Sequence, residues 1–484
     1  MPTPIDGLEP ALVWKHFAAF SRVPRCSKHE EAAAKFVMEA ARRLKLEAMQ
    51  DKAGNVLVRK PASPGREGVA SLCLQGHLDM VCEKNAGTKH DFSKDPIELV
   101  RKDNMMMANG TTLGADNGIA VATNLAIMED RSIEHGPLEF LFTVDEETGL
   151  TGANMLEPGF LQSGRLMNLD SEEEGAIYVG CSGGKDTTAT WTFAPEDVPA
   201  KLAGLEVTVT GLKGGHSGME IDKGRGNAIK ILNRVLLDLG TLGARLARID
   251  GGNKRNAIPR EATALVFLLP AKLAAAKACV AAWHDTARNE LGAVEPDLAV
   301  SAADVKGRKG KLLPRGLQHK LTRALASLPH GVVKMSADIP GLVETSTNLA
   351  SIATKGKAIT VATSQRSSLA SEIAEIAQTV RFVLEAAGAE VKQGDGYPGW
   401  KPNMASPLLK TAIDTYKSLY GKKPAVKAIH AGLECGIIGE KYPGMDMISF
   451  GPTLEGVHSP DEKIHIDTVP KFWGFLLGIL KNVA

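Results

Sequence analysis

Histidine and carboxylate side chains that could bind metal ions occur in five short stretches of this sequence. They are His77 with Asp79, Asp116, the pair Glu146-Glu147, Asp170, and His458. Two histidines and several carboxylates without a cysteine form a nitrogen and oxygen donor set that suits zinc, manganese or cobalt. Two such ions about 3.5–4 Å apart, sharing a carboxylate and a water, form a common hydrolytic centre. The residue types therefore predict a hydrolase with two divalent metal ions.

Each of these stretches follows a predicted strand or opens a predicted helix. The apolar run 69–74 predicts a buried strand, and His77 and Asp79 come soon after it. The runs 138–144 and 165–169 are also apolar, and acidic residues follow both. Because α/β sheets usually carry their sites at the carboxyl ends of strands, we expect these groups to meet there. Acidic groups packed at one edge repel one another unless cations hold them.

The adjacent carboxylates Glu146 and Glu147 could divide two tasks. One can bind metal while its neighbour stays free as a general base for the attacking water. The alternative is a solvated helix start, since carboxylates favour a helix's first turn. Likewise His458, in a loop before Pro460, could be an ordinary surface residue. Only the occurrence of all five stretches in one chain favours a metal centre over these separate alternatives.

A serine nucleophile is a second hydrolytic possibility. The stretch 180–184 reads Gly-Cys-Ser-Gly-Gly and fits the Gly-x-Ser-x-Gly pattern. A nucleophile elbow of that type leads from a strand into a helix. Residues 187–193 alternate like a strand instead, so we reject a serine hydrolase.

The order of predicted elements indicates an α/β fold with an insertion. Helices over 10–48 and strands near 55–59 and 71–74 begin a largely parallel, mixed sheet covered by helices. After about residue 185 the strands become alternating and half-exposed, which predicts an α+β insert with antiparallel strands. We therefore expect a catalytic domain formed by residues 1–186 and 395–484, interrupted by an inserted domain at 187–394.

The overall composition argues against several classes of partner. The chain has 484 residues, and 57 basic against 56 acidic residues give a net charge of +1. Without a basic stripe or a long apolar run, we expect no nucleic-acid or membrane partner. The amino terminus has no secretory-signal pattern. Six cysteines are scattered singly, so we expect reduced thiols in a cytoplasmic protein.

Four longer stretches carry a specific resemblance. They are Gln75-Gly76-His77-Leu78-Asp79-Met80-Val81, residues 110–118 (GTTLGADNG), residues 168–175 (NLDSEEEG) and residues 430–436 (HAGLECG). These stretches resemble the zinc amidohydrolase family that contains carboxypeptidase G, aminoacylase, carnosinase and bacterial dipeptidases. The resemblance covers nearly the whole chain and is weaker in the insert.

The resemblance implies a ligand set for two metal ions, which we expect to be zinc, with manganese or cobalt as alternatives. His77 and Asp170 would hold one ion, and Glu147 and His458 the other. Asp116 would bridge the two.

It also implies roles for residues that do not bind metal. Asp79 would hydrogen-bond His77, and Glu146 would take a proton from the attacking water and pass it to the leaving nitrogen. In this family the bond after the bridging aspartate, here Asp116–Asn117, is typically a cis peptide.

Further residues would bind the substrate. His216, in Gly-Gly-His-Ser-Gly, resembles a lid histidine that donates to the developing oxyanion. Asn348 and Arg366 resemble lid residues that hold the substrate carboxylate, for which the arginine fork is suited. The Gly432 backbone would contact substrate, and Glu434 would pair with its free amino group.

The resemblance implies a dipeptidase for unblocked dipeptides, with aminoacyl-histidine substrates such as carnosine in range. The insert would act as a lid and would form a homodimer. An N-acyl-amino-acid deacylase or a tripeptidase on the same centre is the alternative. A non-catalytic peptide-binding module would lack a ligand or the base, yet all of them are present.

Overall fold

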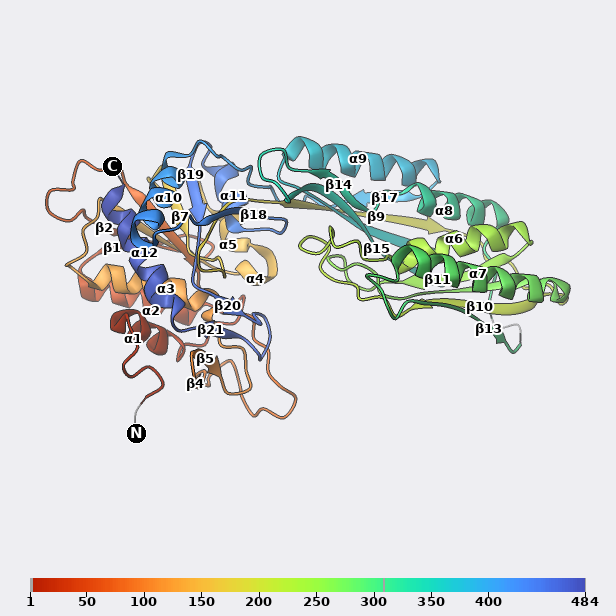
Figure 1. Ribbon diagram of the computed structural model, residues 1–484, viewed down its shortest axis with the longest axis horizontal. Helices are drawn as coiled ribbons and strands as arrows, with labels where there is room; N and C mark the ends of the chain where they lie inside the picture. Colours follow the sequence, from red (N-terminus) through yellow and green to blue (C-terminus); the bar gives the residue numbers. More distant parts are fainter. Residues whose placement is uncertain (1–2, 308–309, 484) are drawn as a thin grey trace. The chain divides into compact units, whose positions relative to one another are not determined.

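The chain forms two compact units. The computed structural model describes residues 3–307 and 310–483. The first unit comprises Met1–Cys181, Trp400–Ala428 and Leu433–Ala484, and the second comprises Ser182–Gly399 and Ile429–Gly432. Figure 1 shows the two units in sequence colours, with the insert in yellow, green and teal. The chain thus leaves the first unit at Cys181 and returns at Trp400.

An eight-stranded mixed sheet organises the first unit. Its central strands β6, β3, β7 and β19 are parallel neighbours, and the outer pairs β1–β2, β2–β6 and β19–β8 are antiparallel. In sheet order the strands are β1 (Glu47–Gln50), β2 (Val56–Lys60), β6 (Leu138–Thr143), β3 (Leu72–His77), β7 (Arg165–Asn168), β19 (Asp446–Ser449), β8 (Ala176–Cys181) and β18 (Ala425–Ile429). β3 and β6 are buried at every position, and most of their side chains are apolar.

Helices cover this sheet. α3 packs on β3 and α1, while α10 packs on β19 and α12. The longer helices are α1 (Ala11–Phe20), α2 (Glu31–Leu44), α3 (Ala115–Glu129), α10 (Pro407–Tyr420) and α12 (Thr468–Asn482); the short ones are α4 (Glu146–Gly149), α5 (Thr151–Met155) and α11 (Glu434–Lys441). α3 is buried almost throughout, so its small side chains let it lie close to the strands.

A small antiparallel sheet lies beside the main one in the first unit. It joins β4 (Leu99–Lys102) and β5 (Met105–Ala108) to β21 (Lys463–His465) and β20 (Leu454–Glu455). Met106 is fully buried there and packs in the same core as Trp14 and Phe17. Met106 is therefore a packing residue of this unit.

An antiparallel nine-stranded sheet forms the second unit. Leu205, Val207 and Val209 alternate along β10 and project into a core that helices α6 to α9 help to form. The strands are β9 (Gly183–Thr192), β10 (Ala203–Thr210), β11 (Arg245–Gly251), β12 (Ala262–Leu268), β13 (Ala299–Val305), β14 (Gly331–Met335), β15 (Val343–Lys355), β16 (Ala358–Ser367) and β17 (Glu390–Gln393), and the helices are α6 (Ala228–Thr241), α7 (Leu273–Leu291), α8 (Arg315–Ser327) and α9 (Ala370–Ala386).

Within residues 3–307 and 310–483, no helix combines the length and the apolar character that crossing a bilayer requires.

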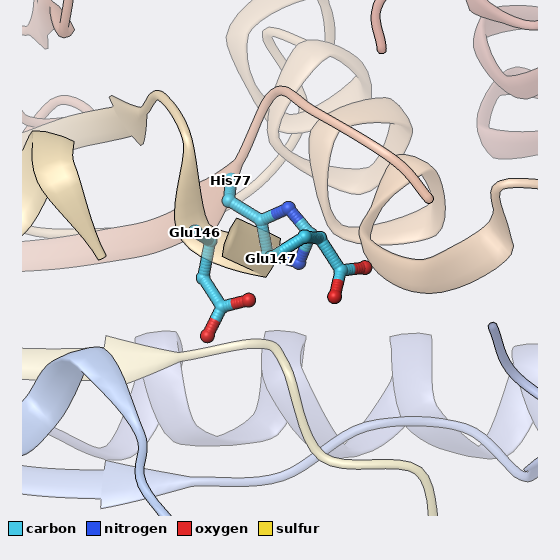
Figure 2. A group of neighbouring side chains, drawn as sticks. All are labelled: His77, Glu146 and Glu147. Atoms are coloured by element: carbon cyan, nitrogen blue, oxygen red, sulfur yellow. The ribbon is translucent and has the colours of Figure 1, made fainter. Parts of the chain in front are cut away.

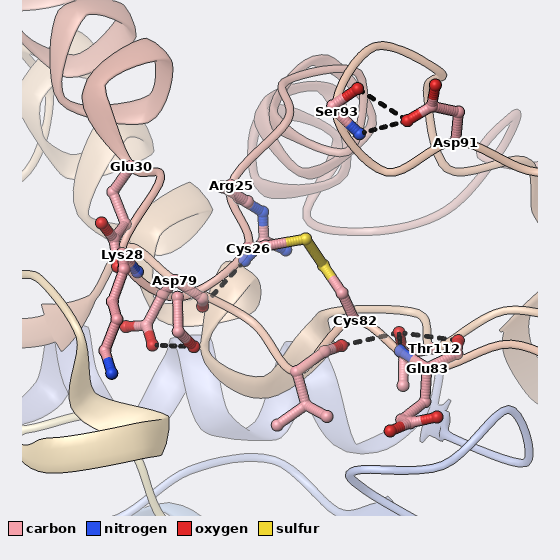
Figure 3. The surroundings of a disulfide bond; sticks show 12 residues. Arg25, Cys26, Lys28, Glu30, Asp79, Cys82, Glu83, Asp91, Ser93 and Thr112 are labelled. Atoms are coloured by element: carbon pink, nitrogen blue, oxygen red, sulfur yellow. Dashed lines mark hydrogen bonds between the residues drawn. A yellow bond between two sulfur atoms is a disulfide. The ribbon is translucent and has the colours of Figure 1, made fainter.

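The expectation of reduced thiols is wrong for two of the six cysteines. Cys26 and Cys82 form a disulfide, with their Cα atoms 5.7 Å apart (Figure 3). The backbone brings them together because Cys26 pairs with Met80 in an isolated parallel bridge, and the Met80 N–H donates to the Arg25 carbonyl at 3.1 Å. A separation of 56 residues hides this pairing from any local cysteine pattern. Cys73, Cys181, Cys279 and Cys435 are free thiols.

Candidate metal centre

A buried histidine at the end of β3 lies among carboxylates. His77 is the last residue of that strand, and its Nε2 lies 3.1 Å from Asp116 Oδ1 and 3.3 Å from Asp170 Oδ1. Asp170 comes just after β7, which runs parallel to β3. The ligand atoms of the three side chains lie within 4.8 Å of one another, close enough to share one metal ion.

A second cluster includes the other oxygen of Asp116. His458 Nε2 lies 3.2 Å from Asp116 Oδ2 and 2.9 Å from Glu147 Oε2. His458 has a positive φ of 61° and a half-exposed side chain, so it reaches the cluster from a turn rather than from the core. The two clusters share Asp116, and between them they contain all five residues for which ligand roles were expected.

The segment that carries Asp116 is tied to the strand ends by the next residue. The Asn117 Oδ1 accepts the His77 backbone N–H at 3.2 Å, and the Asn117 Nδ2 donates to the Leu169 carbonyl at 3.0 Å. The Asp116–Asn117 peptide bond is cis, as the resemblance implied. Asn117 therefore faces β3 and β7 while Asp116 faces the two histidines.

Asp79 occupies the opposite side of the His77 ring. Its Oδ1 lies 3.2 Å from His77 Nδ1, whereas the Nε2 faces Asp116. Asp79 also accepts the backbone N–H groups of Glu146 at 3.0 Å and Glu147 at 3.2 Å. Burial opposes its ionisation, but His77, the Ser27 hydroxyl and the Glu146 N–H lower its pKa to about 2. One carboxylate thus fixes both the histidine ring and the start of α4.

Glu146 and Glu147 start α4 directly after β6, and their side chains approach that of His77 (Figure 2). Glu147 belongs to the His458 cluster, whereas Glu146 groups with His77 and Glu147. Burial raises the pKa of Glu146 well above its usual value, and neighbouring carboxylates add to the effect. The raised pKa makes Glu146 a stronger base than an ordinary carboxylate, which suits a residue that accepts a proton.

The donor set fits two divalent cations. Glu147 Oε1 and Asp170 Oδ1 are buried without a hydrogen-bond partner, a costly state that a cation would relieve. Burial raises the pKa of Asp170 to about 7. The Asp116 and Glu147 carboxylates raise the pKa of His458 to about 11. Without metal, bound protons therefore supply positive charge that the metal ions would otherwise supply to the clusters.

Glu434 is the first residue of α11 and contacts residues of β3 and β6. Its Oε2 accepts hydrogen bonds from Gln75 Nε2 at 2.5 Å and Thr143 Oγ1 at 2.7 Å, while its Oε1 is buried without a partner. Burial raises the Glu434 pKa to about 7. Gln75 and Thr143 were not among the expected site residues, and only their places at the ends of β3 and β6 could have indicated them.

In the second unit, two backbone N–H groups hold the His216 ring by one of its nitrogens. Its Nδ1 accepts the backbone N–H groups of Gly218 at 3.2 Å and Met219 at 3.1 Å. The neutral ring then carries its proton on Nε2. Burial and the nearby Arg366 lower the His216 pKa to about 4, so the ring stays neutral and Nε2–H remains a donor.

The other expected substrate residues of the second unit lie on β15, on β16 and in the segment Ile429–Gly432. Arg366 donates to Tyr397 Oη at 3.0 Å, and its Nε is buried without a partner. The Asn348 Nδ2 donates to the carbonyls of Ala257 at 2.8 Å and Arg255 at 3.3 Å, so its donor group is already used. Gly432 lies against Tyr397, where a Cβ would come within 2.9 Å of the ring.

Two overlapping histidine and carboxylate clusters at the strand ends of a mixed sheet define a candidate metallohydrolase. The model of peptidase family M20/M25/M40 matches residues 73–482, and the chain belongs to this family. The resemblance, fold class and enzyme class expected from the motifs are thereby confirmed.

Full-length relatives include two dipeptidases by name. The cytosol non-specific dipeptidase of Escherichia coli (strain K12) is 41% identical over 99% of this chain and 99% of its own length. The crystal structure of aminoacylhistidine dipeptidase from Vibrio alginolyticus matches with a TM-score of 0.93 and 41% identity, over 99% of this chain and 98% of its own. Aminopeptidase PepT from Bacillus cereus, at 17% identity and a TM-score of 0.55 over 98% and 99% of the two chains, shares the fold alone.

Proposed function

We propose that this protein is a dipeptidase that hydrolyses unblocked dipeptides, including aminoacyl-histidine substrates such as carnosine, with two divalent metal ions. The sharing of Asp116 by two ligand clusters is the observation that carries the proposal. The names of the two full-length relatives at 41% identity support the choice of substrate.

His77 and Asp170 would hold one ion, Glu147 and His458 the other, and Asp116 both. Zinc is the ion we propose, because imidazole and carboxylate suit it. Bound divalent ions would supply Lewis acidity to the scissile carbonyl and lower the pKa of water.

Glu146 would move the proton in this reaction. It would remove a proton from the attacking water and deliver it to the nitrogen that leaves when the peptide bond breaks. Its burial favours the protonated form, which stabilises the state after the first transfer. Asp79 would act through others, by fixing the His77 ring and the Glu146 backbone N–H.

Residues of the second unit would recognise the rest of the transition state and the substrate. His216 would donate its Nε2–H to the developing oxyanion, which its Nδ1 hydrogen bonds favour. Arg366 would bind the substrate carboxylate through its guanidinium, whose Nε is buried without a hydrogen-bond partner. Asn348 would donate to the same carboxylate only if its Nδ2 released the carbonyl of Ala257 or Arg255. The Gly432 backbone would line the same subsite.

Glu434 would receive the free amino group of the substrate. Its Oε1 is buried without a hydrogen-bond partner, and an ammonium group would satisfy it. This contact would distinguish an unblocked dipeptide from an N-acyl amino acid, which lacks the positive charge.

We further propose that the second unit acts as a lid and forms a homodimer. Support comes from β14, where Val333 and Met335 are exposed on a strand paired only with β15. Analytical ultracentrifugation should give the mass of two chains, and the mass of one chain would contradict the dimer.

A cytoplasmic location is proposed from the name of the Escherichia coli relative. The Cys26–Cys82 disulfide opposes it, because the cytoplasm keeps most thiols reduced. Trapping thiols in intact cells with an alkylating reagent would show whether Cys26 and Cys82 are reduced, as a cytoplasmic location predicts, or joined in the disulfide.

The activity test is a substrate panel assayed with and without a chelator. Ala-His and β-Ala-His should be cleaved, and removal of metal should abolish cleavage. Tripeptides and N-acetyl amino acids test the two alternatives, a tripeptidase and a deacylase. Faster cleavage of either than of every dipeptide would overturn the proposed substrate class, and full activity after metal removal would overturn the mechanism.

A further inference from the structure

A buried carboxylate far along the chain binds the backbone of the segment that carries Asp116. Glu462 is 2% exposed. Its Oε2 accepts the N–H groups of Leu113 at 2.8 Å and Gly114 at 2.9 Å, and its Oε1 accepts the N–H of Asp116 at 3.1 Å. These N–H groups precede or open α3, where the helix itself offers them no acceptor. One side chain therefore supplies three missing hydrogen-bond partners.

A buried guanidinium binds the same segment through its carbonyl oxygen. Arg25 is 2% exposed, and its Nη2 donates to the Gly114 carbonyl at 2.6 Å. Its Nη1 donates to the carbonyl of Asp79 at 3.1 Å, directly after β3 (Figure 3). The same nitrogen donates to the Leu78 carbonyl at 3.3 Å. Arg25 thus joins the Asp116 segment to the strand end that carries His77.

Gly114 lies between the two charged side chains. Its φ is 68°, and a Cβ there would come within 2.4 Å of Arg25 Nη2 and 2.8 Å of Met80 Sδ. Arg25 could not approach the backbone as closely if this residue carried a side chain. Glu462 also follows His458 by four residues, on the turn that carries a ligand of the second cluster.

We propose that Glu462 and Arg25 are positioning residues that hold Asp116 where its two oxygens serve both metal ions. The inference rests on the proposed metal centre. Through the backbone, Glu462 couples Asp116 to His458, and Arg25 couples it to His77. Loss of the hydrogen bonds that either side chain makes to this backbone would leave the shared carboxylate less well fixed, so binding of the pair of ions should weaken.

A carboxylate elsewhere in the first unit provides a matched control. Glu139, on β6, is 3% exposed. Its Oε2 accepts the backbone N–H groups of Ser163 at 2.8 Å and Gln162 at 3.0 Å, and its Oε1 pairs with Arg59 Nε at 3.1 Å. It binds backbone N–H groups as Glu462 does, but it belongs to neither metal cluster. Glu139→Gln therefore reports the effect of losing a buried carboxylate that only supports the fold.

The experiment titrates Mn²⁺ into metal-free wild type, Glu462→Gln, Arg25→Lys and Glu139→Gln by calorimetry. Circular dichroism measures the folded fraction of each. Wild type and Glu139→Gln should bind two ions per chain with similar affinity. Glu462→Gln and Arg25→Lys should bind at least one of the two about tenfold or more weakly. The visible spectrum of the Co²⁺-loaded protein should change in these two variants and not in the control.

Unchanged Mn²⁺ affinity and an unchanged Co²⁺ spectrum in folded Glu462→Gln and Arg25→Lys would overturn the inference. An equal loss of affinity in Glu139→Gln would also overturn it, because the effect would then be one of general stability. If Glu462→Gln does not fold, Arg25→Lys and the charge-conserving Glu462→Asp decide by the same measurements. A wild-type protein that binds no metal would instead refute the proposed function, and this inference with it.

Discussion

His77 illustrates how one side chain meets two different demands. Its Nε2 faces the carboxylates of Asp116 and Asp170, while its Nδ1 faces Asp79. A metal-binding histidine commonly has a carboxylate on its other nitrogen, which fixes the ring and increases its basicity. Asp79 therefore influences a metal ion without belonging to either ligand cluster.

The variants His77→Ala and Asp79→Asn should separate these roles. His77→Ala should lose a metal ion, because it removes a ligand atom. Asp79→Asn should retain both ions when they are in excess and lower kcat by about 10–100-fold. Metal content per chain by plasma mass spectrometry and kcat on Ala-His measure the two effects. Full metal content in both variants would contradict the division of roles.

Glu146 and Glu147 form a second such pair on adjacent residues. Glu146→Gln should keep both metal ions and lower kcat by about 10²–10⁴-fold, since a general base is lost. Glu147→Gln is the matched control, because it removes a carboxylate that faces His458 and should weaken metal binding. If Glu146→Gln lost metal while Glu147→Gln kept it, the two roles would be exchanged.

At the scale of the elements, the strands that lead to the site were predictable and some polar strands were not. β3 and β6 are mostly apolar, and the ligands end these strands or follow them or their neighbours. β15 was missed because residues 344–348 are polar, although all are buried. Their partners are distant in sequence, such as His430 for Ser346 and Ser367 for Thr345. A sequence pattern cannot reveal that tertiary hydrogen bonds will satisfy such a strand.

The same limit applies to the site. The motifs predicted that the five ligand candidates would lie together, and the structure brings them together. Glu462 and Arg25 lacked a local signal, because their partners lie 346 to 349 and 53 to 89 residues away in the chain. Short sequence motifs can therefore indicate the ligand and catalytic residues more readily than the distant residues that position them.

The disulfide makes a testable contribution at this scale. The double variant Cys26→Ser/Cys82→Ser should lower the free energy of unfolding by about 2–4 kcal/mol, because it frees a long loop in the unfolded chain. Urea unfolding under non-reducing conditions measures the change. Cys279→Ser is the control, since Cys279 is a free thiol. Six reactive thiols in the unfolded, unreduced wild-type protein would show that the bond does not form.

At the scale of the whole molecule, the metal-free protein should lose stability as pH rises. Asp170 has a folded pKa of about 7 against an ordinary value of 3.8, so it binds more protons folded than unfolded between those values. His458 does the same between 6.5 and about 11. Where the folded state binds more protons, raising the pH destabilises it.

Thermal unfolding of the chelated protein should therefore occur at a lower temperature at pH 8.5 than at pH 6. Added Zn²⁺ should raise the unfolding temperature more at pH 8.5, because metal replaces protons at the clusters. In the chelated protein, Asp170→Asn should reduce the difference between the unfolding temperatures at pH 6 and pH 8.5, since an asparagine side chain does not titrate. A metal-induced shift that is larger at pH 6 would have the wrong sign for this account.

The most direct test of the central claim counts metal ions against turnover. Zn²⁺ is added stepwise to the metal-free protein while native mass spectrometry records bound ions and Ala-His hydrolysis is followed. Activity should appear as chains with two ions appear, and Asp116→Ala should neither hold two ions nor hydrolyse the dipeptide. Full turnover by metal-free wild type, or by Asp116→Ala, would contradict a centre in which two ions share this carboxylate.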